Sequence, residues 1–559
     1  MKVLRQLGGP VLYLLLALIG QWPALSSLTR ATRCACRDAP QTDWFLAWLP
    51  YAVQHGHDPW LSSYLAAPAG VNLMWNTLLP LPGLLMAPLT LAAGPLASHT
   101  VLAVLAFTCS ATAMWWAVGR WAPWGMARFA AGLLYGFSPY LVAQGDDHLN
   151  LSLVALPPLL LRCLDELLVR QDRRAALVGV CLGLLALAQL LTTEEVLAST
   201  FVLCLTGLAI LVVQHRAALD RPRCRHALVG LGVAAATVLV GAGWPLAVQF
   251  FGSLRLTGAA TDASTFNADL LGLVVPGRHL LLGARIDSWG GGPTENGSYL
   301  GLPLLAALGL VARRYRGLAV VRFALVLGGV AWVLSLGRRL AVAGTDTWLP
   351  LPWAVLDRLP LLQNIAAVRF SLYVVLAAAV LLAVGLDRAR ADGWLGGRAA
   401  LAATAVVLSL LPSWPYRFVD AATPTYFTTA AVKRIPTGAL VLTYPVPRFP
   451  TSEPMQWQAL AGFRYRSVGG YLITRDADGR GTFQGGVTAW ERAVLQAPAG
   501  RGVPPAAVVR GRLLAEMERL QVRAVLVADR PGATDVNRLV GQVLGRPGEH
   551  VGGVTAWYR

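Results

Sequence analysis

The sequence predicts a mainly α-helical, polytopic membrane protein with about 11 transmembrane helices, a long first outer loop and a C-terminal extracytoplasmic α/β domain. Of its 559 residues, 55% are hydrophobic and only 14% are charged, whereas soluble proteins carry about 25% charged residues. Apolar stretches of about 17 to 25 residues, the length that crosses a bilayer, recur up to residue 412. The pattern then changes to short apolar strands and one helix, which divides the chain into a transmembrane domain, 1–412, and a second domain, 413–559.

The apolar stretches place the transmembrane helices. Residues 77–93 are an exception, because their three prolines at 80, 82 and 88 disfavour a long helix. We therefore expect 77–93 to form a short embedded or re-entrant helix packed against protein, and its crossing of the membrane stays open. The expected spans lie near residues 11–28, 97–118, 129–143, 149–168, 175–192, 195–214, 227–250, 299–312, 320–337, 368–386 and 399–412.

The net charge of +18 is gathered largely in short loops between the expected spans. Arginine-rich loops flank membrane spans on the cytoplasmic side, so this distribution indicates membrane lipids, not nucleic acid, as the partner of the positive charge. It predicts a multi-pass protein of the cell membrane, with a cytoplasmic N-terminus and an extracytoplasmic C-terminal domain. The basic loops are Arg120 to Arg128, Arg170 to Arg174, Arg216 to Arg225, Arg313 to Arg322 and Arg388 to Arg398.

The domain 413–559 shows the alternation of a small α/β fold. Residues 439–446 and 522–529 are apolar runs typical of buried strands, and 504–520 has helical periodicity between them. A last short strand is expected at 552–559. The stretch 455–472 is rich in aromatic residues and glycine, which suits either glycan binding or packing against the membrane part.

The first outer loop, 29–76, is the most polar and aromatic segment near the expected spans. Asp43, His55 and Asp58 lie there among tryptophan and tyrosine residues, a composition that suits sugar binding beside lipid. Carboxylates near a bilayer usually face a water-filled cavity or a functional site. The topology places one set of acidic groups on the same outer side, so we expect one acidic, sugar-sized pocket: Asp43, Asp58, Asp146, Asp147, Glu194, Glu195 and Glu295.

Several stretches together resemble the glycosyltransferase-C superfamily, and within it integral membrane proteins of actinobacterial type. The resemblance implies inverting sugar transfer from a polyprenyl-phosphate-linked donor, with Asp43, the acid that follows the first span, as general base. It also implies that a divalent cation, where one is needed, is held by Asp43, Asp146 and Asp147, although that adjacent pair departs from the usual spacing. Glu295 matches a late-loop acid. The stretches are TDWFLAWLPYAVQHGHDPW (42–60), PAGVNLMWNT (68–77), LLYGFSPYLVAQGDDHLNL (133–151), ENGSYLGLPLL (295–305), QNIAAVRFSLY (363–373) and MQWQALAGFRYRSVGGY (455–471).

Each candidate residue in the first loops also has a simple structural explanation. Asp43 precedes an apolar run and can cap a helix. His55 and Asp58 belong to an HGHDP sequence that is equally natural as a turn. The run Asp146, Asp147, His148 either binds a metal or sugar hydroxyls, or forms a solvated hairpin tip.

The later candidates leave similar alternatives open. Glu194 and Glu195 either bind substrate or stabilise the first turn of a helix. Arg369 begins a span on its outer side, where it can bind the donor phosphate through its planar guanidinium group. It can equally extend to the membrane interface as a structural residue.

Two other functions remain compatible with the sequence: a transporter or flippase of lipid-linked glycans, and a non-catalytic membrane assembly protein. A transporter often shows repeated halves and acids at mid-membrane, whereas here the acids gather at one face. The sequence holds no nucleotide-binding fingerprint or zinc-ligand spacing, so no nucleotide cofactor is expected. The expected partners are a polyprenyl-phosphate sugar, membrane lipids and an extracytoplasmic glycan, lipid or protein acceptor.

Overall fold

The computed structural model describes residues 2–32, 38–215, 220–258, 265–284, 286–413, 416, 418–483 and 487–559. The chain is mainly helical and carries a five-stranded sheet in its C-terminal part. It folds into two compact units. Unit 1 comprises Met1–Ser26, Val101–Gly243 and Asp262–Arg417, and unit 2 comprises Ser27–Thr100, Trp244–Thr261 and Phe418–Arg559. The division at residue 412, which rests on composition, stays a prediction.

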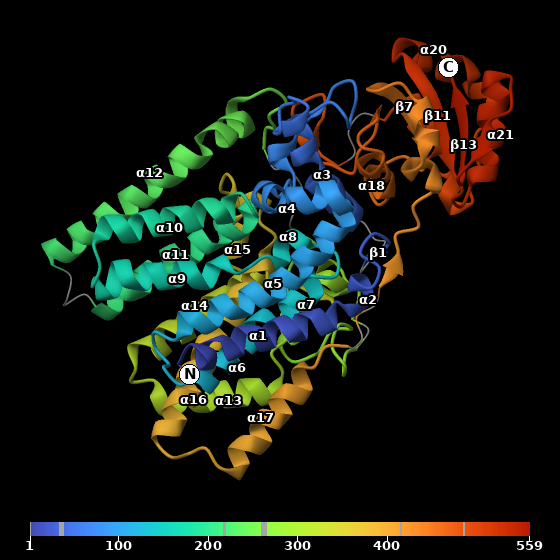
Figure 1. Ribbon diagram of the computed structural model, residues 1–559. Helices are drawn as coiled ribbons and strands as arrows, with labels where there is room; N and C mark the ends of the chain where they lie inside the picture. Colours follow the sequence, from blue (N-terminus) through green and yellow to red (C-terminus); the bar gives the residue numbers. More distant parts are fainter. Residues whose placement is uncertain are drawn as a thin grey trace. The chain divides into compact units, whose positions relative to one another are not determined.

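Unit 1 is a bundle whose long helices run side by side (Figure 1). Two of its helices, α5 and α12, also supply their ends to unit 2. The helices are α1 (Lys2–Gly20), α2 (Trp22–Leu25), α5 (Pro95–Val118), α6 (Gly125–Gly136), α7 (Pro139–Gln144), α8 (Leu149–Ser152), α9 (Leu156–Asp165), the π-helical turn η2 (Glu166–Arg170), α10 (Ala175–Leu190), α11 (Glu194–His215), α12 (Arg221–Phe251), α13 (Leu302–Tyr315), α14 (Ala319–Ser335), α15 (Trp353–Leu356), α16 (Ser371–Ala391) and α17 (Gly397–Leu410), with a hairpin of β4 (Arg339–Val342) and β5 (Thr345–Pro350).

Helices lie at every position where the sequence predicts a span. Among the described residues, four helices are both long and apolar enough to cross a membrane: Pro95–Val118, Glu194–Gln214, Arg221–Phe251 and Ala367–Ala391. Shorter apolar helices cover the remaining positions, so several apolar helices are present and the number of crossings stays a prediction.

The expected span 129–143 is broken in two. Helix α6 ends at Gly136, and Ser138 caps α7 by accepting a hydrogen bond from the backbone N–H of Leu141. Pro139 follows at the first helical position, where a missing N–H costs nothing. The break places Gln144 at the end of α7 and the chain from Gly145 to His148 in a short connection to α8.

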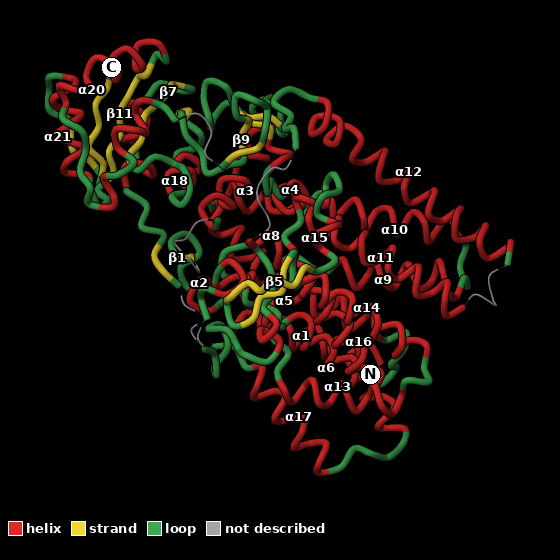
Figure 2. The backbone as a smooth tube through the Cα atoms, turned by 180° about the vertical axis from the view of Figure 1, so that it is seen from behind, coloured by secondary structure: helices red, strands yellow, loops and turns green. Residues whose placement is uncertain are grey.

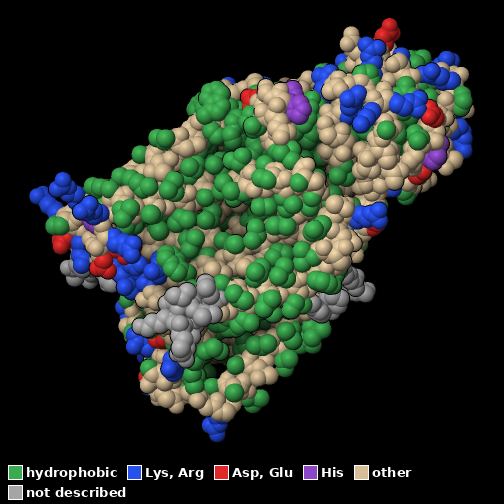
Figure 3. Space-filling model, in the orientation of Figure 1, with side chains coloured by type: hydrophobic (Ala, Val, Ile, Leu, Met, Phe, Trp, Pro, Cys, Tyr) green, Lys and Arg blue, Asp and Glu red, His purple; other side chains and the backbone are tan. Residues whose placement is uncertain are grey.

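The outer faces of unit 1 are apolar. Side chains such as Val240 on α12 and Val213 on α11 are exposed by 89% and 74%. Figure 3 shows hydrophobic side chains covering the face formed by these helices. Helix α16, by contrast, is almost entirely buried and packs against α14 and α6. An apolar exterior around a buried apolar helix is the arrangement of a bundle in lipid.

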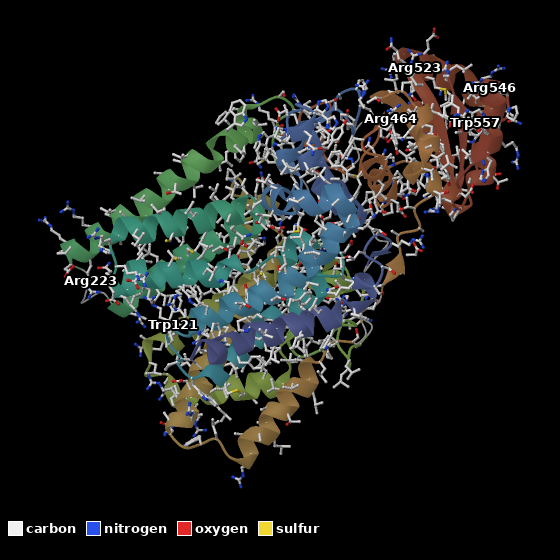
Figure 4. The ribbon with its side chains drawn as sticks, in the orientation of Figure 1. Trp121, Arg223, Arg464, Arg523, Arg546 and Trp557 are labelled. Atoms are coloured by element: carbon white, nitrogen blue, oxygen red, sulfur yellow. The ribbon has the colours of Figure 1, made fainter. Side chains whose placement is uncertain are left out.

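The five basic loops of the sequence, apart from 216–219, which lie outside the described residues, meet at one end of unit 1, where Figure 4 labels Trp121 and Arg223. Their contacts tie each loop to the next, which places this positive charge at one end of the bundle; its cytoplasmic location stays a prediction. The linking contacts are Arg120 with Asp165 (2.5 Å), Arg223 with the carbonyl of Val169 (3.2 Å), the N–H of Trp124 with Asp387 (2.9 Å), and Tyr315 with Asp392 (3.0 Å).

Unit 2 contains the sheet, with strand order β12-β13-β11-β7-β8. Strand β7 runs parallel to β11 and β8, while β13 is antiparallel to β11. The predicted strands and helix of the C-terminal part coincide with β7, β11, β13 and α20. The elements of unit 2 are β1 (Ala31–Thr32), α3 (Ala39–Gln54), β2 (Leu61–Ser62), β3 (Val71–Asn72), α4 (Pro80–Ala93), β6 (Val419–Asp420), β7 (Ala439–Tyr444), α18 (Glu453–Leu460), β8 (Tyr465–Ser467), β9 (Thr474–Arg475), β10 (Gly481–Thr482), α19 (Ala489–Val494), α20 (Ala506–Arg519), β11 (Val522–Ala528), α21 (Ala533–Leu544), β12 (Glu549–Val551) and β13 (Val554–Tyr558).

Both faces of the sheet are buried. Leu440 and Leu442 of β7 pack with α20 and α21, whereas Val441, between them in sequence, packs on the opposite face with Trp457 of α18. Successive side chains of a strand point to opposite faces, so the apolar run of β7 fills two cores. Figure 2 shows α20 and α21 beside the strands β7 and β11.

Candidate functional site

Asp43 lies inside α3, one turn beyond its start, and Asp38 occupies the capping position instead. The side chain of Asp43 is 1% exposed. A buried carboxylate requires partners, and both of its oxygens have one: Oδ1 lies 2.8 Å from Nδ1 of His99, and Oδ2 accepts a hydrogen bond of 2.5 Å from Nε2 of Gln456. Three helices of unit 2 therefore hold this carboxylate.

Sequence reasoning missed both partners of Asp43. His99 lies in the first turn of α5, 56 residues from Asp43, and Gln456 lies on α18, 413 residues away. A single ionisable residue within an apolar segment is a signal of function, and it applies to His99 in the stretch 95–118. Gln456 carries no comparable signal.

A second pair of contacts fixes α3 against α18. The indole N–H of Trp44 donates to Oε1 of Gln458 (2.7 Å), and Nε2 of Gln458 donates to the carbonyls of Tyr64 and Tyr465. The side chain of Gln458 is thus fully satisfied and rigid. Because Trp44 follows Asp43 in sequence, these bonds also fix the position of the catalytic candidate.

Aromatic rings surround this part of α3. Trp44 and Trp48 stack at 5.2 Å between ring centroids, and Tyr51 lies 4.5 Å from the ring of Phe463. Tyr51 and Tyr64 share a hydrogen bond of 2.8 Å between their hydroxyls. Trp44 and Trp48 are buried and serve the core, whereas the half-exposed Tyr51 presents its ring at the surface.

His55 and Asp58 both lie in the turn that follows α3, and both are exposed. Nδ1 of His55 lies 2.9 Å from the carbonyl of Tyr51, the last turn of the helix. Asp58 accepts a hydrogen bond of 2.8 Å from the backbone N–H of Trp60. These contacts are turn chemistry, and both side chains are exposed whereas Asp43 is buried.

Unit 1 has its own buried polar cluster, centred on Arg369 in the 3-10 turn η9 (Ala367–Phe370). Arg369 donates from Nη1 to Oε2 of Glu295, and its Nε lies 3.6 Å from Oε1 of Glu195. Glu195 also accepts a hydrogen bond of 2.8 Å from the N–H of Ala366. Three residues that lie 74 or more positions apart in the sequence are therefore brought together.

Gln144 and His148 extend this cluster. Nε2 of Gln144 donates to Oε2 of Glu295 (3.1 Å), and Nδ1 of His148 lies 2.8 Å from Oε1 of Gln144. Three buried atoms nearby have no hydrogen-bond partner in the part of the chain that the structure describes: Oε1 of Glu295, Nε of Arg369 and the hydroxyl of Tyr140. Buried polar atoms without partners often mark a place for a ligand or an ordered water.

The remaining acidic candidates lie beside this cluster in the chain. Asp147 is buried and Asp146 half-buried in the connection between α7 and α8. Glu194 begins α11, whose start is linked to that connection by the Thr193 hydroxyl, which donates to the carbonyl of Asn150 (2.6 Å). Asp147 and His148 offer neighbouring carboxylate and imidazole ligands, a set that divalent cations accept.

The candidate residues thus fall into two sets. Asp43, His55 and Asp58 belong to unit 2, and the residues from Asp146 to Arg369 belong to unit 1. The single pocket that the sequence predicts for all of them stays a prediction.

No protein-family model matches this chain, and no curated protein matches its sequence. Solved structures do match. The arabinofuranosyltransferase AftD from Mycobacteria superposes with a TM-score of 0.59 at 15% identity, over 99% of this chain and 39% of that one. A mutant of AftD gives 0.57 at 16% identity, over 94% and 36%. The apo oligosaccharyltransferase of Archaeoglobus fulgidus gives 0.53 at 12% identity, over 93% and 69%.

These likenesses concern the fold. The chain spans about two fifths of the length of AftD, 39% in the first superposition. AftD and the oligosaccharyltransferase are both glycosyltransferases of the C type, and the chain has their fold. The resemblance that the sequence motifs indicate is therefore confirmed at the level of the fold.

Proposed function

We propose that this chain is an integral membrane glycosyltransferase that moves a sugar from a polyprenyl-phosphate-linked donor to an extracytoplasmic glycan, lipid or protein acceptor. The fold it shares with AftD and the archaeal oligosaccharyltransferase supports transfer of a sugar. The observation that carries the proposal is Asp43, a buried carboxylate in the segment after the first apolar helix, with each oxygen held by a side chain from another helix.

In this proposal Asp43 is the general base of an inverting transfer. The acceptor hydroxyl gives its proton to Asp43, its oxygen forms the new bond to the anomeric carbon, and the bond from that carbon to the lipid phosphate breaks. An ionised carboxylate has about four lone-pair positions, so the contacts with His99 and Gln456 leave acceptor capacity on Asp43. Those two contacts hold it in one orientation, which is what a general base requires.

The cluster of unit 1 is suited to sugar hydroxyls. Glu295 and Glu195 offer carboxylate oxygens, and two groups without a hydrogen bond, Nε of Arg369 and the hydroxyl of Tyr140, offer donors. The two carboxylates outnumber the single positive charge of Arg369, which makes a neutral polar ligand a better fit there than a phosphate group. Asp147 and His148 extend the set along the chain.

We assign any divalent cation to the carboxylates of Asp146 and Asp147 in unit 1, with His148 as a nitrogen ligand. A cation at such a site would supply positive charge to the phosphate leaving group. Transfer measured with purified protein after chelation, and after return of Mg²⁺, Mn²⁺ or Zn²⁺, tests this assignment. Full activity in the chelator would contradict it.

The proposal is tested by an Asp43→Asn variant of the full chain in lipid nanodiscs. The donors are polyprenyl-phosphate arabinofuranose and a polyprenyl-linked oligosaccharide, chosen from the activities of the two similar enzymes, and release of the lipid phosphate is measured by mass spectrometry. Loss of a general base lowers turnover by about 10²- to 10⁴-fold.

Asp58→Asn is the matched control, because Asp58 lies on the same segment and its carboxylate binds only its own turn among the contacts identified. We expect this variant to turn over at the wild-type rate. Wild-type turnover by a folded Asp43→Asn protein would overturn the assignment of the base, and transport of the donor without sugar transfer would favour a flippase.

A further inference from the structure

Unit 1 contains a largely apolar cavity of about 460 Å³, within the range of about 300–1,000 Å³ typical of ligand sites. Its walls come from α9, α11, α14 and α16. On α11 the lining runs from Thr200 through Cys204 and Leu208 to Gln214. This spacing follows one face of a helix, so the cavity is a groove that runs along the helices.

The groove is longer than the hydrocarbon part of one membrane leaflet and shorter than that of the whole bilayer. On α16 the lining extends from Tyr373 to Arg388, which corresponds to roughly 22 Å at 1.5 Å per residue. The hydrocarbon part of one leaflet is about 15 Å thick. A single acyl chain that enters at one end of the groove therefore fits along it.

The two ends of the groove differ in chemistry. At the end away from the basic loops, the hydroxyl of Tyr373 bonds to the hydroxyls of Ser199 and Thr200, each at 2.8 Å. These bonds pair the three hydroxyls with one another, and Thr200 and Tyr373 are the lining residues at this end. Paired hydroxyls suit contact with a hydrocarbon chain.

The other end opens among arginines, close to Trp121, which Figure 4 labels. Arg120, Arg170 and Arg388 line this end, and Asp165 is the acid among the lining residues. Asp165 lies 2.5 Å from Arg120 and 3.4 Å from Arg170. Arg388 is exposed and forms no ion pair among the described residues. The opening therefore keeps positive charge for an anion.

We propose that this groove is a binding site for an anionic phospholipid, with one acyl chain along α11 and α16 and the phosphate at Arg388 and Arg170. Basic openings between transmembrane helices are the usual sites for anionic headgroups. The site is independent of the proposed sugar transfer. The limited length of the groove favours a phospholipid over a polyprenyl phosphate, whose chain is far longer.

The chain site is tested by Cys204→Trp, which fills the groove, against Leu205→Trp. Leu205 is the next residue on α11, is 54% exposed and lies outside the groove lining. The full protein is released from nanodiscs that contain equal amounts of phosphatidylglycerol and phosphatidylcholine, and retained lipid is measured by native mass spectrometry. We expect wild type and Leu205→Trp to retain phosphatidylglycerol preferentially, and Cys204→Trp to lose it.

The headgroup site is tested by Arg388→Gln against Arg313→Gln, an exposed arginine outside the groove lining. One arginine near an anionic lipid contributes about 1 kcal/mol, so we expect the preference for phosphatidylglycerol to fall about fivefold in Arg388→Gln only. Equal losses in both variants, or no preference in the wild type, would overturn the proposal.

A measurement on the unaltered protein covers the case in which Cys204→Trp does not fold. Phosphatidylglycerol with a photoreactive group at the end of one acyl chain should label peptides of α11 and α16 near Thr200 and Tyr373. Excess phosphatidylglycerol should compete with this labelling. Labelling spread evenly over the exposed faces of α12 and α17, or competition only by polyprenyl phosphate, would contradict the assigned occupant.

Discussion

At the scale of single residues, the two polar clusters differ in how completely they are paired. Asp43 has a partner for each oxygen, whereas Glu295 and Arg369 each leave one buried atom without a hydrogen bond. The first arrangement fixes one group in place, and the second leaves positions for a ligand. The sequence pointed to Asp43 through its place after the first apolar helix, but no local pattern links it to Gln456, because their contact depends on the packing of α3 with α18.

The first prediction concerns the buried pair of Arg369 and Glu295. Arg369→Met leaves the buried carboxylate of Glu295, and the half-buried one of Glu195, without their cation, and we expect it to lower the free energy of unfolding by about 3–5 kcal/mol. The Arg369→Met/Glu295→Met double variant also removes the negative charge of Glu295, which the single variant leaves without its partner. It should therefore be more stable than Arg369→Met alone, as measured by denaturant unfolding in detergent.

The outcome of this double variant separates two explanations of the cluster. If the double variant is less stable than Arg369→Met, the two side chains contribute through packing and hydrogen bonds more than through their charges. Arg538→Met provides the control, because Arg538 and its partner Asp535 are exposed and exposed pairs contribute little.

A second prediction at this scale concerns pH and Glu491 in unit 2. Burial raises the pKa of Glu491 above its usual value near 4.5, although the bonds from Thr488 and the charge of Arg448 favour the carboxylate. Because the folded state then binds the proton more tightly than the unfolded state, the stability from this group is present below pH 4.5 and is lost as pH rises through the folded pKa.

Glu491→Gln removes this titration and can keep the capping box with Thr488, since glutamine serves at the same position. We expect its unfolding midpoint to fall less than that of the wild type when pH rises from about 4 to about 7. Glu518→Gln, at an exposed position on α20, should behave as the wild type does. If Glu491→Gln shows the same pH dependence as the wild type, the pKa of the Glu491 carboxyl does not differ between the folded and unfolded states.

At the scale of elements, close helix contacts in unit 1 depend on small residues. Gly179 and Gly183 of α10 face α12, where an added Cβ would lie 2.4 Å from the carbonyl oxygen of Gly230 and 2.7 Å from that of Ala234. Small residues four positions apart allow helix backbones to approach closely in membranes. The sequence contains this GxxxG spacing, but only the structure identifies α12 as the partner.

The third prediction follows from this contact. Gly183→Val should separate α10 from α12 and lower the free energy of unfolding by about 1–3 kcal/mol, the usual cost of overpacking. Gly232→Ala, on α12 with no atom within 4 Å of the added Cβ, should have little effect. Thermal unfolding of both variants in detergent measures the difference, and equal loss in the two would contradict the packing argument.

The apolar pattern of the sequence predicts where the helices lie more accurately than it predicts where each helix begins and ends. Apolar content alone extended one span across 129–143, because it ignored that Ser138 and Pro139 start a new helix. This break matters for the polar cluster of unit 1, because it places Gln144 and His148 beside Glu295. A capping serine followed by proline is visible in the sequence, and it predicts that a new helix begins at this position.

At the scale of the whole molecule, the sequence predicted the helical class, the apolar helices and the strands of the C-terminal sheet, since each depends on local pattern. It could not predict that unit 2 is assembled from three separate stretches. That assembly depends on contacts between distant residues, such as Asn72 with the carbonyl of Val248 (3.0 Å) and Gln249 with the carbonyl of Met74 (2.8 Å). The change of composition near residue 412 indicates only the last of the three stretches, Phe418–Arg559.

The last prediction concerns the direction in which the chain crosses the membrane. The five basic loops contact one another at one end of unit 1, so they must all face the same side, and the charge rule assigns that side to the cytoplasm. Alkaline phosphatase, which is active only outside the cytoplasm, should therefore be inactive when fused after Gln171 or Gly396 and active when fused after Arg559. If only one of the fusions after Gln171 and Gly396 is active, the basic loops do not all lie on one side of the membrane. If both are active, the orientation is reversed, and the Arg388 end of the lipid groove lies in the outer leaflet.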